Sequence, residues 1–206
     1  MSRVRIKVCG LTRPEDAEVC DAAGVDAIGV IFAAHSRRFV TLDQAARVTA
    51  AVGPFLLRVG VFAGQTEGEI LDAVDRVGLD VVQLHGGEDD ALAARLQARV
   101  RVVRALTWTA GETPAAWRDR PHDGILLDGP KPGSGEAFSW TEAAAWRGVP
   151  RLLLAGGLHP GNVADAVRAM QPWGVDVASG VEASIGQKDP AKVTEFVAAV
   201  RAAEAA

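Results

Sequence analysis

Residues 152–182 read LLLAGGLHPGNVADAVRAMQPWGVDVASGVE, and this stretch contains the pattern that decides the fold. Two short apolar runs, Leu152–Ala155 and Val175–Ala178, enclose a helical segment predicted over Pro160–Met170. A glycine follows each run closely, at Gly156 and at Gly180. A strand, a helix and a second strand in this order predict neighbouring strands of a parallel sheet.

The same alternation extends through the whole sequence. Strands are predicted over Arg5–Cys9, Ala27–Phe32, Leu57–Phe62, Val81–Leu84, Val100–Ala105, Ile125–Asp128, Leu152–Ala155 and Val175–Ala178. Helices are predicted over Glu15–Ala23, Leu42–Val52, Glu67–Val77, Asp89–Ala98, Pro114–Arg118, Thr141–Trp146, Pro160–Met170 and Ala191–Glu204. An open, doubly wound sheet would also fit alternating units. Eight units in 206 residues, with glycine loops after the last two strands, favour α/β class and one closed (β/α)8 barrel (TIM barrel) over residues 1–206.

Several residues mark where the predicted helices start and stop. Pro14 suits a first helical turn, and Thr41 and Thr66 suit N-caps. Three glycines, Gly24, Gly53 and Gly78, follow predicted helices, where a left-handed residue is often needed.

The bulk composition excludes several classes of function. A net charge of −4 and a pI near 5.6 argue against a nucleic-acid partner. Apolar stretches are too short to span a bilayer, so no membrane contact is expected. The first ten residues lack the apolar core of a signal peptide, and two cysteines are too few for a disulfide framework. We therefore expect a cytoplasmic protein, either a monomer or a homodimer.

Two residues at predicted strand ends are candidates for acid–base chemistry, because barrel enzymes collect their chemistry there. Cys9 ends the first strand and can act as a base if its pKa is lowered; as an alternative, it is a small buried apolar residue. Asp128 ends the sixth strand and can act as an acid if burial raises its pKa; as an alternative, it belongs to an Asp-Gly turn. Strand parity places Lys7 and Cys9 on the interior face. A buried ammonium needs a partner, and we expect Asp176.

Other residues fit the binding of a phosphorylated ligand. The loops that contain Gly156, Gly157, Ser179 and Gly180 follow strands seven and eight, where barrels often bind phosphate through backbone N–H groups. Each loop alone also fits a tight turn. The polar side chains Gln83 and His85 flank the end of the fourth strand. The four histidines show no metal-binding spacing, so no metal is expected.

Taken in order, these motifs resemble those of the phosphoribosylanthranilate isomerase family of tryptophan biosynthesis, over nearly the whole chain. The motifs are Lys7-Val8-Cys9-Gly10-Leu11-Thr12, Gly24–Gly29, Ser36–Val40, Val59–Phe62, Val82–Gly86, Leu126-Leu127-Asp128, Gly133-Ser134-Gly135 with Phe138 and Trp140, Leu154–Leu158, Asp176 to Glu182, and Lys188-Asp189. Each motif is weak by itself, whereas the ordered set is highly specific.

The resemblance implies an Amadori rearrangement of N-(5-phosphoribosyl)anthranilate without a cofactor. It implies Cys9 as the general base, Asp128 as the general acid, and Arg38 as the arginine that faces the substrate carboxylate. It also implies that the loop of Gly133 and Gly135 belongs to the substrate site. The chain departs from the family pattern at Arg37, where proline is usual, at Pro132, where glycine is usual, and at Ser139, where aspartate is usual.

Two alternative functions are considered. The isomerase of histidine biosynthesis performs the same rearrangement on another phosphoribosyl amine, but it has aspartate at the position of Cys9 and internal half-barrel similarity. A catalytically silent phosphosugar-binding barrel would keep the glycine loops and lose the acid or the base. Both Cys9 and Asp128 are present, which disfavours this alternative.

Overall fold

The computed structural model describes residues 3–109, 112–129, 140 and 143–204. Eight parallel strands close into a barrel in sequence order, and β1 pairs with both β2 and β8. The strands are β1 Arg5–Cys9, β2 Ala27–Ile31, β3 Leu57–Phe62, β4 Val81–Leu84, β5 Arg101–Thr107, β6 Gly124–Asp128, β7 Leu152–Leu154 and β8 Gly174–Val177. The predicted (β/α)8 barrel is confirmed, with strand ends that shift by at most two residues.

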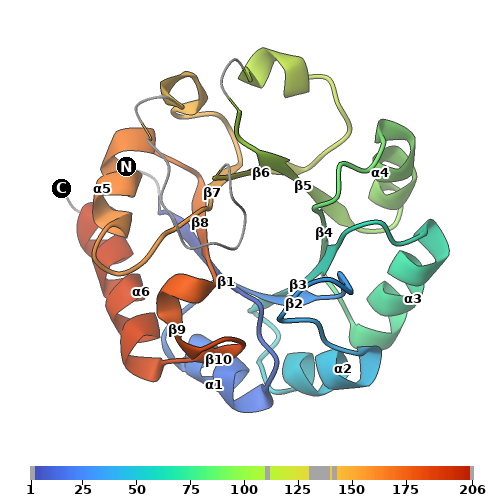
Figure 1. Ribbon diagram of the computed structural model, residues 1–206, viewed down its shortest axis with the longest axis horizontal. Coiled ribbons are helices and arrows are strands. Elements are labelled where there is room, and N and C mark those ends of the chain that lie inside the picture. Colours follow the sequence, from blue (N-terminus) through green and yellow to red (C-terminus); the bar gives the residue numbers. More distant parts are fainter. Residues whose placement is uncertain (1–2, 110–111, 130–139, 141–142, 205–206) are drawn as a thin grey trace.

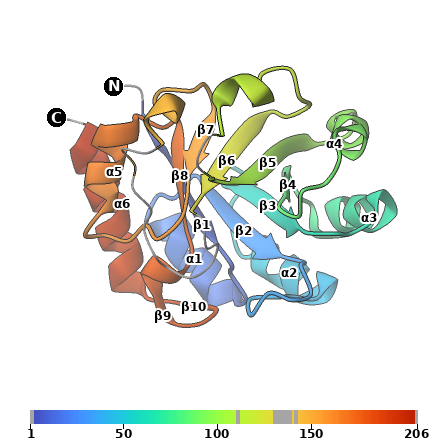
Figure 2. The ribbon, with the colours of Figure 1, turned by 45° about the horizontal axis from the view of Figure 1, so that its top comes forward.

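Helices surround the barrel on its outside (Figures 1 and 2). They are α1 Pro14–Ala22, α2 Leu42–Ala50, α3 Glu67–Val77, α4 Asp90–Gln97, α5 Val163–Met170 and α6 Pro190–Glu204. None of the described helices is long and apolar enough to cross a membrane.

The helical segments predicted after β5 and β6 are short 3-10 turns in the part of the chain that the structure describes. After β5 the chain forms the 3-10 segment η1 Pro114–Trp117, and after β6 it forms η2 Ala144–Trp146. The first two residues of the helix predicted over Thr141–Trp146 lie outside the described residues. Each short segment buries one tryptophan, Trp117 or Trp146, against the core. A single large side chain thus covers barrel surface that a longer helix would otherwise cover.

One further pair of strands was not predicted. Glu182–Ser184 (β9) and Gln187–Lys188 (β10) form an antiparallel pair after the 3-10 turn η3 Ser179–Val181. This pair lies outside the barrel, beside α1 and α6 in Figure 1. Strands of two or three residues are too short to show an alternating pattern in a sequence.

The helix caps follow the sequence closely, with one exception. Thr41 and Thr66 each form a capping box with the residue three positions on, and Gly78 ends α3 in the left-handed region at φ +70°. Gly24 is also left-handed. The prediction for Gly53 is wrong, because α2 ends earlier, at a right-handed Ala51. The N–H of Gly53 instead donates to a carboxylate oxygen of Asp21 at 3.1 Å.

Side chains of β1 alternate between two environments. Val4, Ile6 and Val8 belong to the large apolar core between the barrel and its helices. Lys7 and Cys9 face the barrel interior, as parity predicted, and Lys7 is 3% exposed. Because strands place alternate residues on opposite faces, the polar positions are confined to the inside of the barrel.

The cap of α3 gives a test of local stability. We expect Thr66→Ala to lower the free energy of unfolding by about 1 kcal/mol, because the N–H of Glu69 loses its acceptor. Thr194→Ala is the matched control, since Thr194 is an exposed residue within α6 whose hydroxyl donates to the carbonyl oxygen of Pro190 and accepts from no helix N–H. Urea unfolding of both variants measures the difference, and equal stabilities would contradict the capping role.

Candidate active site

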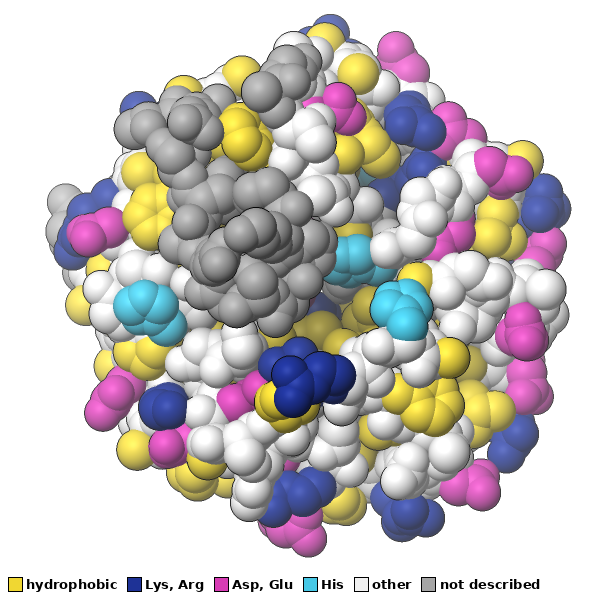
Figure 3. Space-filling view, in the orientation of Figure 1, with side chains coloured by type: hydrophobic (Ala, Val, Ile, Leu, Met, Phe, Trp, Pro, Cys, Tyr) yellow, Lys and Arg dark blue, Asp and Glu magenta, His cyan; other side chains and the backbone are white. Residues whose placement is uncertain are grey.

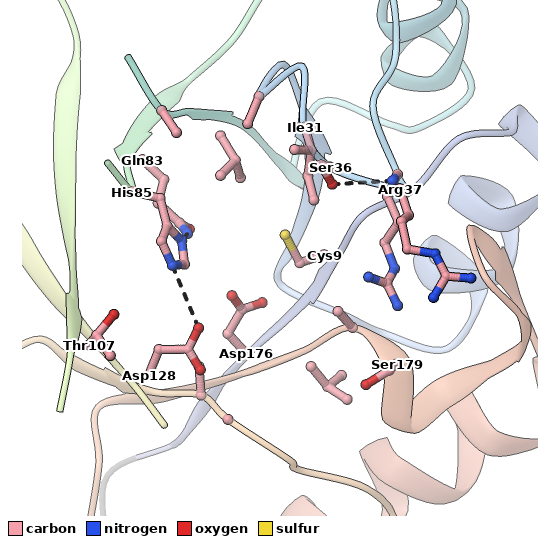
Figure 4. Close-up of a pocket in the computed structure, with 18 of the residues that line it drawn as sticks. Cys9, Ile31, Ser36, Arg37, Gln83, His85, Thr107, Asp128, Asp176 and Ser179 are labelled. Carbon is pink, nitrogen blue, oxygen red and sulfur yellow. Dashed lines mark hydrogen bonds and ion pairs between the residues drawn. The ribbon is translucent and has the colours of Figure 1, made fainter. Parts of the chain in front are cut away.

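A cavity of about 510 Å³ opens at the end of the barrel where the parallel strands finish. Its walls come from strand ends and the loops that follow them, and include Cys9, Gln83, His85, Asp128 and Asp176. Figure 4 shows these side chains converging from different strands on one space. The strand-end residues selected from the sequence are therefore brought together by the closure of the barrel.

Asp128 is the last residue of β6 and is 6% exposed. Burial raises the pKa of its carboxyl group to about 6, although the Gly129 N–H, which donates to Oδ1 at 2.8 Å, opposes the shift. The negative charge of Asp176 contributes in the same direction as burial. Asp128 can therefore hold a proton at a pH where an ordinary aspartate has lost it.

Cys9 ends β1 and is a free, buried thiol. Gly29 on β2 leaves the space that the thiol occupies, because a Cβ atom there would lie 2.8 Å from Cys9 Sγ. Burial raises the pKa of the Cys9 thiol, while the nearby ammonium groups of Lys7 and Lys188 act in the opposite direction. The neutral thiol is thus the favoured form.

Lys7 pairs with Asp176, as the sequence predicted. Lys7 Nζ lies 2.8 Å from Asp176 Oδ2, and both side chains are buried. Burial by itself would lower the pKa of Lys7, but Asp176 and Cys9 together raise it above its ordinary value. The other oxygen, Asp176 Oδ1, is buried and has no hydrogen-bond partner among the described residues. A ligand hydroxyl would satisfy this acceptor.

His85 connects Gln83 to Asp128. Its Nδ1 lies 3.2 Å from the Gln83 side-chain nitrogen, and its Nε2 lies 3.6 Å from Asp128 Oδ2. Burial lowers the pKa of His85, and the charge of Lys7 adds to that effect. The imidazole is therefore neutral near pH 7. An amide that donates to Nδ1 leaves the Nε2–H tautomer, which points its proton at Asp128.

The two glycine loops meet beside the cavity. Gly156, Gly157 and Ser179 line it. Within the described part of the chain, the N–H groups of Gly156 and Gly157 donate to no other group. Gly180 has a packing role, because a Cβ there would lie 1.9 Å from the carbonyl oxygen of Leu158. Unused N–H donors on adjacent glycines are a suitable site for an anion.

Arg38 and Arg37 stand at the mouth of the cavity, in the loop after β2. In Figure 3, dark-blue basic side chains lie at the rim of the central hollow. Arg38 Nε and Nη2 each donate to one carboxylate oxygen of Glu182, both at 2.7 Å. Glu182 also accepts from Lys188 Nζ at 3.0 Å.

Sequence reasoning gave no role to Glu182 or Lys188, although both fall in the quoted motifs. The side chain of Lys188 is 0% exposed, and its ammonium also donates to the carbonyl oxygens of Cys9 and Ala178. Lys188 thereby fixes the backbone beside Cys9 and beside the second glycine loop. A lysine that caps carbonyls from distant strands has no local sequence signal.

Two predicted positions, Gly133 and Gly135, lie outside the described residues. Among the described residues, no group of three or more His, Cys, Asp or Glu side chains has the arrangement of a metal site.

Comparison with known proteins assigns the chain to a family. A family model described as N-(5'-phosphoribosyl)anthranilate (PRA) isomerase matches residues 6–199. The N-(5'-phosphoribosyl)anthranilate isomerase of Pseudomonas fluorescens (strain Pf0-1) is 45% identical, over 98% of this chain and 100% of that protein.

Solved structures agree with the family model. The phosphoribosylanthranilate isomerase of Thermus thermophilus is 38% identical, with a TM-score of 0.90 over 97% of this chain and 99% of that one. A second solved phosphoribosylanthranilate isomerase is 34% identical, with a TM-score of 0.85, and the match covers 97% of this chain and 99% of that chain. With a family model that spans residues 6–199, this chain belongs to the N-(5'-phosphoribosyl)anthranilate isomerase family.

Proposed function

We propose that this cavity catalyses the Amadori rearrangement of N-(5'-phosphoribosyl)anthranilate to 1-(2-carboxyphenylamino)-1-deoxyribulose 5-phosphate, a step of tryptophan biosynthesis. The observation that carries the proposal is one cavity that contains a buried thiol, Cys9, and a buried carboxyl group with a raised pKa, Asp128. The 34% identical relative was solved with reduced 1-(o-carboxyphenylamino)-1-deoxyribulose 5-phosphate bound, which is the reduced form of that product.

Asp128 acts first, as the general acid. It donates its proton to the ring oxygen of the ribose, the bond from C1 to that oxygen breaks, and the amine nitrogen forms an iminium with C1. The burial that raises the pKa of Asp128 keeps a proton available for this step. His85 Nε2 lies on the other side of the same carboxyl group and stabilises the carboxylate that remains.

Cys9 acts second, as the general base. The iminium makes the C2 proton acidic, and the thiolate removes it to give an enolamine. Loss of the C2 hydroxyl proton and protonation at C1 then give the ketone. Asp176 Oδ1, a buried carboxylate oxygen without a partner among the described residues, accepts a hydrogen bond from that hydroxyl. These proton transfers require no cofactor.

The phosphate is held by the glycine loops. The N–H groups of Gly156 and Gly157 have no acceptor among the described residues, and Ser179 lines the same wall. Backbone donors bind phosphate without a change in the net charge of the protein, which agrees with the overall charge of −4.

Cellular location and assembly follow from the same assignment. A catalytic thiol must stay reduced, so we propose that the enzyme acts in the cytoplasm. One solved relative is described as mutually generated monomers of the dimeric enzyme from Thermotoga maritima, so a dimer occurs among the relatives, and we propose a monomer or a homodimer for this chain. The proposed partner is the small phosphorylated substrate.

Removal of either catalytic group is expected to lower kcat by about 10²–10⁴-fold, the usual contribution of general acid–base catalysis. We expect this result for Cys9→Ala and for Asp128→Asn, with unchanged circular dichroism, in an assay that forms the substrate in situ. Cys20→Ala is the matched cysteine control, because Cys20 is buried in α1, away from the cavity. Full activity of Cys9→Ala would refute the assignment of the base.

The order of the two pKa values predicts the pH dependence. Asp128 loses its proton near pH 6, whereas burial raises the Cys9 pKa above its ordinary value. Between these values most molecules hold ionised Asp128 and neutral Cys9. The active form has the proton on Asp128 and a thiolate at Cys9, so it carries the same number of protons as this major form. The fraction of molecules in the active form therefore stays constant with pH between the two pKa values.

We therefore expect kcat/KM to rise as the pH increases to about 6, to stay level, and to fall only above the ordinary thiol pKa. Initial rates measured between about pH 5 and pH 10 test this expectation, since kcat/KM reports on the free enzyme. A decrease that already begins above pH 6 would show that the thiolate exists before Asp128 ionises, which reverses the proposed order.

A further inference from the structure

A buried lysine beside the catalytic thiol has no role in the proposed proton transfers. Lys188 ends the short strand β10, and its side chain is 0% exposed. Its ammonium group donates to the carbonyl oxygens of Cys9 at 2.7 Å and of Ala178 at 3.1 Å. It also donates to Oε1 of Glu182 at 3.0 Å. An ammonium group has three N–H donors, so each donor of Lys188 has its own acceptor.

The three acceptors require the charged form of Lys188. Burial lowers the pKa of Lys188, and the charge of Arg38 adds to that effect. Glu182 and Cys9 act in the opposite direction. A neutral amine would have only two N–H donors, and its lone pair would face an oxygen that cannot donate. The hydrogen bonds therefore hold this side chain as an ammonium.

The two carbonyl groups mark the point where β1 and β8 separate. The last residues that these strands pair with each other are Val8 and Val177. Cys9 and Ala178 follow them directly, beyond the end of the register between the two strands. The ammonium of Lys188 binds one oxygen of each and so takes the place of the next rung. A side chain from a strand pair outside the barrel (Figure 1) thus extends the closing seam at the catalytic end.

The two backbone segments that Lys188 joins hold two different parts of the proposed substrate. Cys9 carries the thiol that removes the C2 proton, and Ala178 precedes Ser179, which lines the wall where the phosphate is held. Figure 4 shows Cys9 and Ser179 on the wall of the same cavity. Covalent bonds limit the distance between C2 and the phosphate within the substrate. The distance between the thiol and the phosphate loop must match it, because reacting atoms have to approach to about 3–3.5 Å.

We propose that Lys188 is a positioning residue that sets the spacing between the base, Cys9, and the phosphate-binding loop that begins at Ser179. Because its side chain is fully buried, Lys188 acts through the backbone and does not contact the substrate. This inference rests on the proposed function. A misplacement of reacting groups by about 1 Å can cost about 10²-fold in rate, so a bridge at this seam has a large effect on kcat.

The test replaces the ammonium by an apolar group of similar length. Lys188→Met removes the charge and all three donors, and Lys188→Gln, which keeps an amide donor, is the second variant. Lys192→Met is the matched control, because Lys192 donates to a backbone carbonyl of the same region, that of Glu182 at 2.8 Å, and not to the two carbonyls at the seam. Circular dichroism and urea unfolding define conditions in which each variant is folded.

For Lys188→Met we expect kcat to fall about 10²-fold while the Kd of inorganic phosphate stays within about twofold of the wild-type value. Inorganic phosphate contacts only the loop, and the loop by itself remains intact when its spacing from the thiol changes. Lys192→Met should match the wild type in both measurements.

The pH profile separates spacing from charge. The charge of Lys188 lowers the pKa of Cys9, so its loss raises that pKa. A rise of about one unit in the thiol pKa lowers the level region of kcat/KM about tenfold and moves its upper end by about one pH unit. We expect the level to fall about 10²-fold with a displacement below about one unit, so that most of the loss comes from spacing.

Four results would overturn the inference. Wild-type kcat in a folded Lys188→Met or Lys188→Gln would leave Lys188 a structural role alone. A Kd of phosphate that rises as much as kcat falls would assign it to the phosphate loop. A displacement of the profile by about two pH units would make charge the cause. Failure of both variants to fold would assign Lys188 to the fold. Absence of turnover in the wild type would instead reject the proposed function, and that result requires no variant.

Discussion

The buried ion pair between Lys7 and Asp176 joins the first strand of the barrel to the last. The two residues are direct neighbours in the register of β1 and β8, and their side chains meet at 2.8 Å inside the barrel. Loss of one partner from a buried pair costs about 3–5 kcal/mol, because the other charge remains without compensation. Closure of the barrel and the position of these charges thus depend on each other.

The same pair sets the electrostatics of the catalytic groups. Burial is the largest cause of the pKa shift at each of these groups, raising the pKa of Cys9 and Asp128 and lowering that of His85. The charge of Lys7 lowers all three pKa values, and the charge of Asp176 raises them. Because the side chains of Lys7, Asp176, Cys9 and Asp128 are buried, such interactions act with little screening. One ion pair therefore links the stability of the fold to the protonation of the acid and the base.

A second charge network performs a similar task at the rim. Lys188 joins the backbone of Cys9 and Ala178 to Glu182, and Glu182 holds Arg38. The catalytic thiol, the second glycine loop and the arginine loop after β2 are thereby connected through one buried ammonium group.

The sequence by itself determined the barrel, because eight apolar strand patterns alternate with helical segments, and these patterns are local. Parity also placed Lys7 and Cys9 inside and named Asp176 as the partner. Local patterns did not show that the segments that bury Trp117 and Trp146 are 3-10 turns. They also missed the very short strand Glu182–Ser184. Only the tertiary structure decided which form of Asp128 and Cys9 prevails, and which arginine is already paired. The contacts that place these charges join residues far apart in the chain, such as Lys7 with Asp176, Arg38 with Glu182 and Lys188 with Cys9, and no local pattern records them.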